Sequence, residues 1–184
     1  DGGTGGSMVG AGTEGGRPVF VRGDVGTSLY DGTAGIAWSL AACAIASGDE
    51  HMAQVAVAAT RHALAGAEAM VESAKWGLFD GATGVAWSAA VVGRALAEPA
   101  LCDAAAGLIA DIAVSVAREP TRMDEVDLIG GLSGALLGLL GCAATLSLAL
   151  PDLTAARAAL ARAAHQLVEV LLVRVDSLVL QQPE

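Results

Sequence analysis

One eleven-residue segment recurs three times along this chain at a nearly constant interval. The first copy, residues 29–39, aligns without a gap with residues 78–88, and a more divergent third copy occupies residues 128–138. The first glycine of each copy falls at residue 32, 81 or 131, so the intervals are 49 and 50 residues. Self-similarity at such a period is the signature of repeat architectures, in which each unit buries its apolar face against its neighbours.

Each repeat unit has room for two helices. The first begins at the glycine motif and is apolar almost all round, over about residues 33–46, 82–97 and 132–148, which indicates burial on several sides. The second is amphipathic and follows a stop such as Ser47-Gly48. Hydrophobic residues make up 54% of the chain but aromatic residues only 3%, which favours helices over sheets. We therefore predict an all-α fold of alternating inner and outer helices.

The chain length and the glycine content predict one folded domain with a leader. A chain of 184 residues is long enough for one domain with a real core. Half of the first sixteen residues are glycine, and they show no apolar periodicity. Burial of apolar surface would therefore not compensate for the conformational entropy that these residues lose when they become ordered. We expect residues 1–24 to be a flexible leader or linker and residues 25–180 to be the helical domain.

The net charge and the positions of the cysteines limit which partners the chain is expected to bind and which cell compartment it suits. The net charge is −10, and a polyanionic surface repels phosphate backbones, so we expect no nucleic acid partner. Cys43, Cys102 and Cys142 are scattered singly through apolar segments, without a disulfide framework or a CxxC metal clip. This usage fits a reducing cytoplasm.

The uncharged run over residues 128–150 has the length of a membrane-spanning helix. It also carries Gly134 and Gly138 at the spacing that lets two membrane helices touch. Its many small residues weaken its hydrophobicity, and the other two copies of the repeat carry no such span. We therefore expect no membrane partner.

The glycine motif predicts how the inner helices begin. Asp31 and Asp80 directly precede the first glycine and are predicted to be N-caps. Two glycines three residues apart, such as Gly32 and Gly35, lie on one helical face and would let neighbouring backbones approach where helices converge about an axis. A Gly-x-x-Gly helix start can also hold a phosphate, but no strand precedes it and no Lys-Ser/Thr follows, which argues against P-loop and Rossmann sites.

The repeated Leu-aromatic-Asp-Gly-x-x-Gly-Ile/Val-Ala-Trp unit, followed by Asp-Leu-Ile-Gly-Gly-Leu-Ser-Gly at residues 127–134, resembles the opening repeats of the lanthionine synthetase C-like cyclases. The resemblance covers about residues 29–150. It implies an α/α toroid of seven inner helices ringed by seven outer helices, of which this chain would supply about three repeats. It also implies an activity: the thiolate of a peptide cysteine adds to a dehydroalanine or dehydrobutyrine and closes a thioether ring during lanthipeptide maturation. The precursor peptide is then the expected partner.

Two motifs that the resemblance implies for the chemistry do not occur in this sequence. The family's zinc site is two cysteines and a histidine, with an adjacent Cys-His pair, and its acid/base histidine lies in an Ala-His-Gly motif. We therefore assign no cofactor to this chain, although zinc is expected in the complete family domain. Cys43 and Cys142 occupy equivalent positions of inner helices and are interpreted as small core residues. His51, His62 and His165 are predicted to lie on the surface of outer helices.

Asp127 is the catalytic candidate, because the resemblance places there an aspartate that supports the catalytic histidine across a central cavity. A helix cap or a simple loop carboxylate is the alternative. The motif aromatics could line a peptide cleft, although aromatics at matching repeat positions are more often core residues. The substrate-cavity candidates are Asp31, Tyr30, Asp80 and Phe79, and Trp38 and Trp87 are the other matching aromatics.

Three repeats would leave the apolar flanks of the terminal inner helices bare, at about 25 cal/mol for each Å² of unburied apolar surface. We therefore expect the rest of the toroid, another subunit or self-association to cover them, and we expect this chain alone to be inactive. A non-catalytic helical-repeat module that binds a peptide or a partner enzyme in peptide maturation is the alternative function. An unrelated α/α-toroid enzyme such as a glycosidase would need paired acidic residues along the axis.

Overall fold

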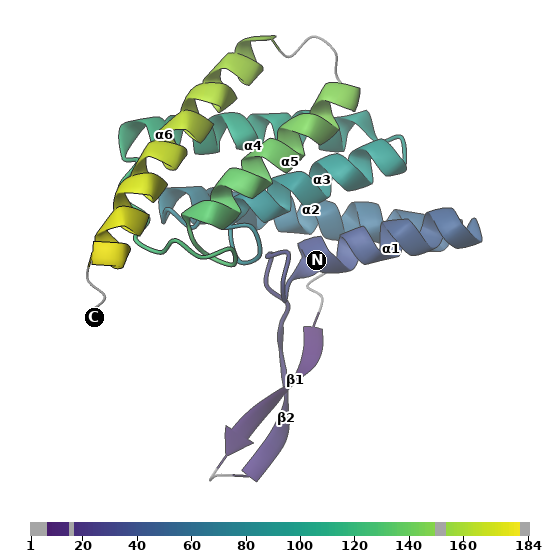
Figure 1. Cartoon of the computed structure of the whole chain (residues 1–184). Coiled ribbons are helices and arrows are strands. Elements are labelled where there is room, and N and C mark those ends of the chain that lie inside the picture. Colours follow the sequence, from purple (N-terminus) through teal and green to yellow (C-terminus); the bar gives the residue numbers. More distant parts are fainter. Residues whose placement is uncertain (1–6, 15–16, 150–153, 181–184) are drawn as a thin grey trace.

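The computed structural model describes residues 7–14, 17–149 and 154–180. The described part after residue 24 is an all-α body, which confirms the predicted fold class at that level. Figure 1 shows the helices stacked in hairpins, with an N-terminal β-hairpin projecting from the body. The helices are α1 (Thr33–Ser47), α2 (Glu50–Glu72), α3 (Ala82–Ala95), α4 (Pro99–Arg118), α5 (Leu132–Ala149) and α6 (Thr154–Leu180).

The N-terminal hairpin was not expected from the sequence. Strands β1 (Ser7–Glu14) and β2 (Arg17–Asp24) pair antiparallel, with Ser7 opposite Asp24. Among the described elements, the hairpin contacts no helix. Residues 1–6 and 15–16 of the expected leader lie outside the described residues. The flexibility of residues 1–24 stays a prediction.

The six helices of the described residues form two layers. The inner helices α1, α3 and α5 contact one another in sequence order, and so do the outer helices α2, α4 and α6. Each inner helix also packs against the outer helix that follows it. Because α1 does not contact α5, the three helical hairpins lie side by side rather than closing on one another.

The three inner helices begin in the same way. In each repeat the chain folds back over the helix start, and the N–H of the first helical residue donates to a carbonyl seven residues earlier. This satisfies one of the four N–H groups that a helix start leaves without an intrahelical partner. The bonds run from Thr33 N to Gly26 O (2.8 Å), from Ala82 N to Lys75 O (2.8 Å) and from Leu132 N to Glu125 O (2.9 Å).

The predicted aspartate caps are wrong. The N-cap residues of α1 and α3 are Gly32 and Gly81, and neither helix start receives a hydrogen bond from a side chain of its cap. Asp31 instead accepts a hydrogen bond from the Ser28 hydroxyl at 2.6 Å. The backbone of the preceding loop takes the place that a capping carboxylate would fill.

The second glycine of each motif is required by the loop of its own repeat. A Cβ added at Gly35 would overlap the carbonyl oxygen of Leu29, and the same overlap occurs between Gly84 and Leu78. The close approach predicted for these glycines is therefore mainly between the loop and its own helix. Between α3 and α5, other glycines allow close packing: a Cβ at Gly141 would lie 2.7 Å from the Trp87 ring.

The main core lies between α3, α4, α5 and α6. Its largest fully buried side chain belongs to Trp76, in the loop that leads to α3. A second, smaller cluster joins α1 and α2 to α3 and α4. The largest apolar members of the main core that are fully buried are Trp76, Ile112, Leu132, Leu139 and Leu167.

One helix of the described chain, α4, has the length and apolar composition to cross a membrane, and 44% of its most apolar window is buried inside the protein. It packs against α2, α3, α5 and α6. An outer helix that buries one apolar face against a protein core can meet the same criteria of length and composition as a membrane span.

Candidate functional site

The three glycine-motif loops lie side by side at the starts of the inner helices. The N–H of Tyr30 donates to the carbonyl of Phe79 at 2.8 Å, and the N–H of Phe79 donates to the carbonyl of Ile129 at 2.9 Å. These three residues occupy equivalent repeat positions, so the bonds form a regular ladder from loop to loop. We call this surface, made of residues 28–32, 77–81 and 127–131, the motif rim.

All four substrate-cavity candidates lie on the motif rim. Tyr30 is 75% exposed and Phe79 is half-buried, while Asp31 and Asp80 are exposed. The carboxylate of Asp80 lies over Gly130 of the next loop, where an added Cβ would approach it to 3.1 Å. The structure thus brings these side chains to one surface, and whether they contact a substrate stays a prediction.

Asp127 also lies on the motif rim, and its carboxylate holds the third loop together. Oδ1 accepts from the N–H of Ile129 at 2.6 Å and from that of Gly130 at 3.0 Å. The hydrogen bonds from Gly130 and then Ile129 lower the pKa of Asp127 below its ordinary value of 3.8. This exposed carboxylate is therefore ionised at neutral pH, so it can accept a proton or a hydrogen bond but cannot act as a proton donor.

Asp127 also ends the loop ladder. In the first two repeats the N–H at the aromatic position donates to the next loop, but the equivalent N–H of Ile129 donates to Asp127. A side chain of the same loop thus takes the place of a neighbouring carbonyl. This is the loop-carboxylate role that the sequence left open as an alternative.

A shallow pocket lies at each end of the motif rim. The one at the first repeat, about 430 Å³, is lined by Tyr30, Asp31 and the exposed side of α1. The one at the third repeat, about 520 Å³, is lined by residues 124–127 and by Arg174 on α6. Arg174 donates to the Asp124 carboxylate at 2.8 Å and to the Thr121 carbonyl at 3.1 Å, so it ties α6 to the third loop. No sequence pattern pointed to this arginine.

Trp38 and Trp87 pack between successive inner helices. Their rings meet edge to face, with centroids 5.6 Å apart and planes at 69°. The Trp87 indole N–H donates to the Thr145 hydroxyl on α5 at 3.2 Å. Both rings are half-buried, and Trp87 packs against the main core. The expectation that the matching aromatics are core residues is therefore met only in part, and it is wrong for Tyr30.

The two buried cysteines, Cys102 and Cys142, do not fit a zinc site. Cys142 is fully buried in the core, and burial raises the pKa of its thiol to about 12. Burial, with a smaller contribution from Asp103, also raises the pKa of Cys102. A zinc ligand must be a thiolate, which such surroundings disfavour. Within residues 7–14, 17–149 and 154–180, no group of three or more His, Cys, Asp or Glu side chains could hold a metal ion.

The histidines lie where the sequence placed them. His51 and His62 are exposed on α2, and His165 is exposed on α6, where its Nε2 lies 3.3 Å from Oε1 of Glu169. All three are therefore on the outer layer and away from the motif rim. None of them is near enough to the buried cysteines to complete a metal site in the described structure.

The interpretation of Cys43 as a core residue is wrong, whereas that of Cys142 is confirmed. Cys43 is exposed, although the equivalent Val92 and Cys142 are fully buried. Val92 packs against α1, and Cys142 lies against the second repeat near Cys102. This face of an inner helix is thus covered by the preceding repeat, and none of the described helices precedes α1.

The exposure difference predicts the thiol chemistry. At pH 8 we expect one thiol per chain, Cys43, to react rapidly with an aromatic disulfide reagent in the native protein, and the other two to react at least about a hundredfold more slowly. Cys43→Ser should abolish the fast phase, and Cys142→Ser should leave it unchanged. A fast phase of two or three thiols would contradict the buried positions of Cys102 and Cys142.

Comparison with known proteins agrees with the repeat pattern. The family model described as lanthionine synthetase C-like protein matches residues 23–182. The match spans all six helices and the whole motif rim. A search of curated proteins finds no significant match.

Proposed function

Because this chain belongs to the lanthionine synthetase C-like family, we propose that it forms three successive repeats of an α/α toroid that closes thioether rings in a peptide. In this reaction a cysteine thiolate of the peptide adds to a dehydrated serine or threonine, and a proton is then delivered to the enolate. The observation that carries the proposal is the loop ladder of the motif rim, because it repeats one stacking geometry from loop to loop.

The free face of α5 supports a further repeat on that side. In α3, Trp87 packs against Gly141 and Thr145 of the next inner helix. The equivalent residue of α5 is Leu137, which is 44% exposed, and its neighbour Leu140 is 51% exposed. Exposed leucines at the positions that pack elsewhere in the protein favour a covering partner of the same kind.

The free face of α1 supports the same conclusion on the other side. Ser88 of α3 is buried and donates to the Ala34 carbonyl of α1 at 2.7 Å. The equivalent Ser39 is exposed and donates to Gly35 of its own helix. Small residues at this face would let another inner helix approach as closely as α1 approaches α3.

On this proposal, the chain contributes the rim of the substrate cavity rather than the thiol activator. Tyr30 and Phe79 offer aromatic surface to a peptide, and Asp31 and Asp80 offer hydrogen-bond acceptors. Asp127, held ionised by backbone N–H groups, would orient a histidine supplied by another repeat. Since the described cysteines and histidines do not fit a zinc site, no step of the proposal uses a metal bound by this chain.

The proposed partners follow from the same reasoning. A precursor peptide is the substrate, and further repeats, supplied by the rest of the toroid, by another subunit or by self-association, cover the faces of α1 and α5. The net charge of −10 opposes binding to nucleic acid. Buried free thiols at Cys102 and Cys142 are consistent with a reducing cytoplasm, and we propose no membrane partner.

A ring-closure assay tests the proposal. A dehydrated peptide with one free cysteine is incubated with this chain alone and with a protein that contains the chain and the remaining repeats, and thiol loss and the cyclised product are measured by mass spectrometry. We expect closure only with all repeats present. In that protein, Asp127→Asn should lower kcat by about tenfold or more, because partners of catalytic groups typically contribute 10–100-fold.

Asp176→Asn is the matched control, since Asp176 is an exposed carboxylate of α6 outside both rim pockets. It should leave turnover unchanged. Unchanged turnover in Asp127→Asn would show that this residue has no catalytic role. Ring closure at enzymatic rates by this chain alone would contradict the need for further repeats, and peptide binding without turnover by the complete protein would favour the non-catalytic module.

A further inference from the structure

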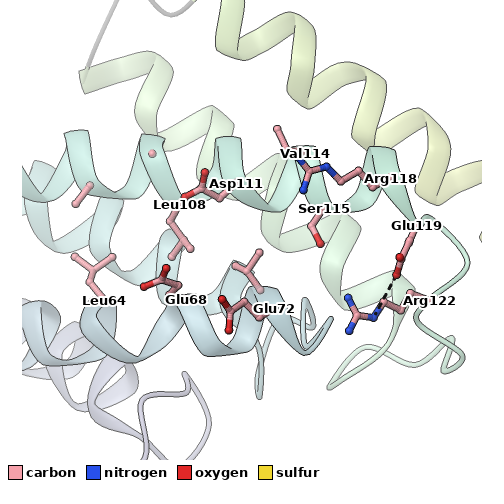
Figure 2. A pocket seen from close by; sticks show the side chains of 13 residues that line it. Leu64, Glu68, Glu72, Leu108, Asp111, Val114, Ser115, Arg118, Glu119 and Arg122 are labelled. Carbon is pink, nitrogen blue, oxygen red and sulfur yellow. Dashed lines mark ion pairs between the residues drawn. The ribbon is translucent and has the colours of Figure 1, made fainter.

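A further pocket lies on the outer layer, away from the motif rim. It is a groove between α2 and α4 with a volume of about 870 Å³. Figure 2 shows Leu64 of α2 and Leu108 of α4 facing each other, with Glu68 and Glu72 on α2 and Asp111 beside α4. We call this surface the outer groove and define it by Leu64, Glu68, Glu72, Gly107, Leu108 and Asp111.

The outer groove is acidic on balance, because four carboxylates line it beside two arginines, Arg118 and Arg122. Its central carboxylates form no ion pair among the described side chains. Glu68 and Glu72 are exposed and lie four residues apart on one face of α2, where like charges destabilise a helix. Asp111 joins them from α4, and none of the three forms an ion pair. Near one end of the groove, Arg122 pairs with Glu119 at 3.5 Å.

The floor of the outer groove is apolar. Leu108 is only 9% exposed, and Leu64 and Val71 are half-buried against the main core. Val114 of α4 continues this surface and is 48% exposed. From Leu64 to Glu72 the groove follows α2 for about 12 Å, the length of two helical turns. An apolar floor flanked by carboxylates is complementary to an amphipathic segment with basic residues.

Gly107 leaves open space on the α4 side of the groove. It lies in the interior of α4, where glycine costs about 1 kcal/mol relative to alanine. A Cβ added there would meet nothing within 4 Å, whereas every other glycine inside a described helix has a neighbour at that distance. The packing of the described residues therefore does not require a glycine at residue 107, and the missing side chain leaves room for another backbone to come close.

We propose that the outer groove binds a cationic amphipathic helix of a partner polypeptide. Its apolar face lies on Leu64 and Leu108, its backbone passes over Gly107, and its lysine or arginine side chains meet Glu68, Glu72 and Asp111. This is a helix-in-groove mode of recognition, in which apolar anchors provide affinity and charge sets orientation and specificity. The site is separate from the motif rim and does not depend on ring-closure activity.

Binding of a defined probe peptide tests the proposal on the full chain. The probe is a fluorescein-labelled amphipathic peptide of leucine and lysine, about three turns or 11 residues long, and its binding is followed by fluorescence anisotropy. The same peptide with glutamate in place of lysine is the charge control. We expect the lysine peptide to bind and the glutamate peptide not to bind, with affinity for the lysine peptide falling by about tenfold or more between low salt and about 0.5 M NaCl.

Two variants test whether the probe peptide binds in the outer groove. Gly107→Leu fills the open space and replaces glycine with a better helix former, so it should stay folded and bind at least about tenfold more weakly. Glu68→Gln/Glu72→Gln should weaken binding about fivefold, as expected for two exposed charge pairs. Glu50→Gln/Asp176→Asn changes the net charge equally at exposed carboxylates outside the groove and should change binding less than about twofold.

Several results would overturn the proposal. If the groove pair and the control pair of substitutions weakened peptide binding equally, the peptide would be attracted by the overall negative charge of the protein and not by the groove. Unchanged binding in Gly107→Leu would place the peptide elsewhere, and binding of neither peptide would leave the groove without this function. Light scattering without peptide measures self-association of the chain. If the chain self-associates and Gly107→Leu abolishes this, a second copy of the chain occupies the groove instead.

Discussion

Replacing Gly84 with alanine should destabilise the protein by about 3 kcal/mol, at the upper end of what overpacking costs. The added Cβ would overlap the carbonyl oxygen of Leu78 and would lie 3.0 Å from the Cβ of Leu29 in the preceding repeat. Moving the loop backbone away from α3 to make room would lengthen the hydrogen bond from Ala82 N to Lys75 O. Thermal unfolding should show a fall in Tm of about 6–12 °C, at 2–4 °C for each kcal/mol in a chain of this size.

Gly107→Ala is the matched control for this substitution. It makes the same chemical change inside a neighbouring helix, but its Cβ meets nothing within 4 Å. Alanine should therefore stabilise α4 by about 0.5–1 kcal/mol through helix propensity alone. If Gly84→Ala were as stable as the native chain, the loop could not cross the start of α3 as described here, and the common start of the three inner helices would be in doubt.

Trp76→Ala should have a similar or larger effect, with a loss of about 4 kcal/mol in the free energy of unfolding. The Trp76 side chain is fully buried in the main core. Its backbone belongs to the loop that leads to the second part of the motif rim. Its carbonyl also accepts a hydrogen bond from the Thr83 hydroxyl at 2.8 Å. Removing the indole would leave a cavity where the loop, α3 and the main core meet. Urea unfolding followed by far-ultraviolet circular dichroism measures the loss.

Trp76→Phe separates the ring from its polar group. The indole Nε1 of Trp76 is buried and has no hydrogen-bond partner among the described residues, so phenylalanine removes an unsatisfied donor along with part of the ring. We expect this variant to lose less than about 1.5 kcal/mol, because the cavity and the relieved N–H act in opposite directions. A loss as large as that of Trp76→Ala would mean that the N–H has a partner in solution.

These substitutions also separate the two surfaces of the protein. Gly84 and Trp76 support the motif rim, whereas Gly107 faces the outer groove on the other layer. The ring-closure proposal depends on the first surface and the peptide-docking proposal on the second. A variant that removes one activity and keeps the other would show that the two surfaces act independently.

The sequence predicted the helical units with good accuracy. The glycine motifs placed the starts of the inner helices at residues 33, 82 and 132, where α1, α3 and α5 begin. Ser47-Gly48 was predicted to end the first inner helix, and Gly48 has a φ of 73° at its C-cap. The family followed from the same three motifs and is confirmed over residues 23–182. All of these features depend on residues close together in the chain.

Several features of the site could not be predicted in this way. The aspartate caps were wrong because the loop carbonyls already satisfy the helix starts, and Cys43 was misplaced because its burial depends on a neighbouring repeat. The tie between Arg174 and Asp124 joins residues fifty positions apart. The outer groove joins faces of two helices that are each amphipathic alone.

The sequence by itself determined the repeat, the helix starts and the family of this protein, because the spacing of glycines and apolar side chains acts within one turn or one helical hairpin. Only the tertiary structure decided which carboxylates are held by backbone N–H groups, which cysteine is exposed and where an acidic groove opens. The physical reason is that burial and hydrogen bonding at these positions are set by a second segment of chain, whose distance and orientation appear in no local pattern.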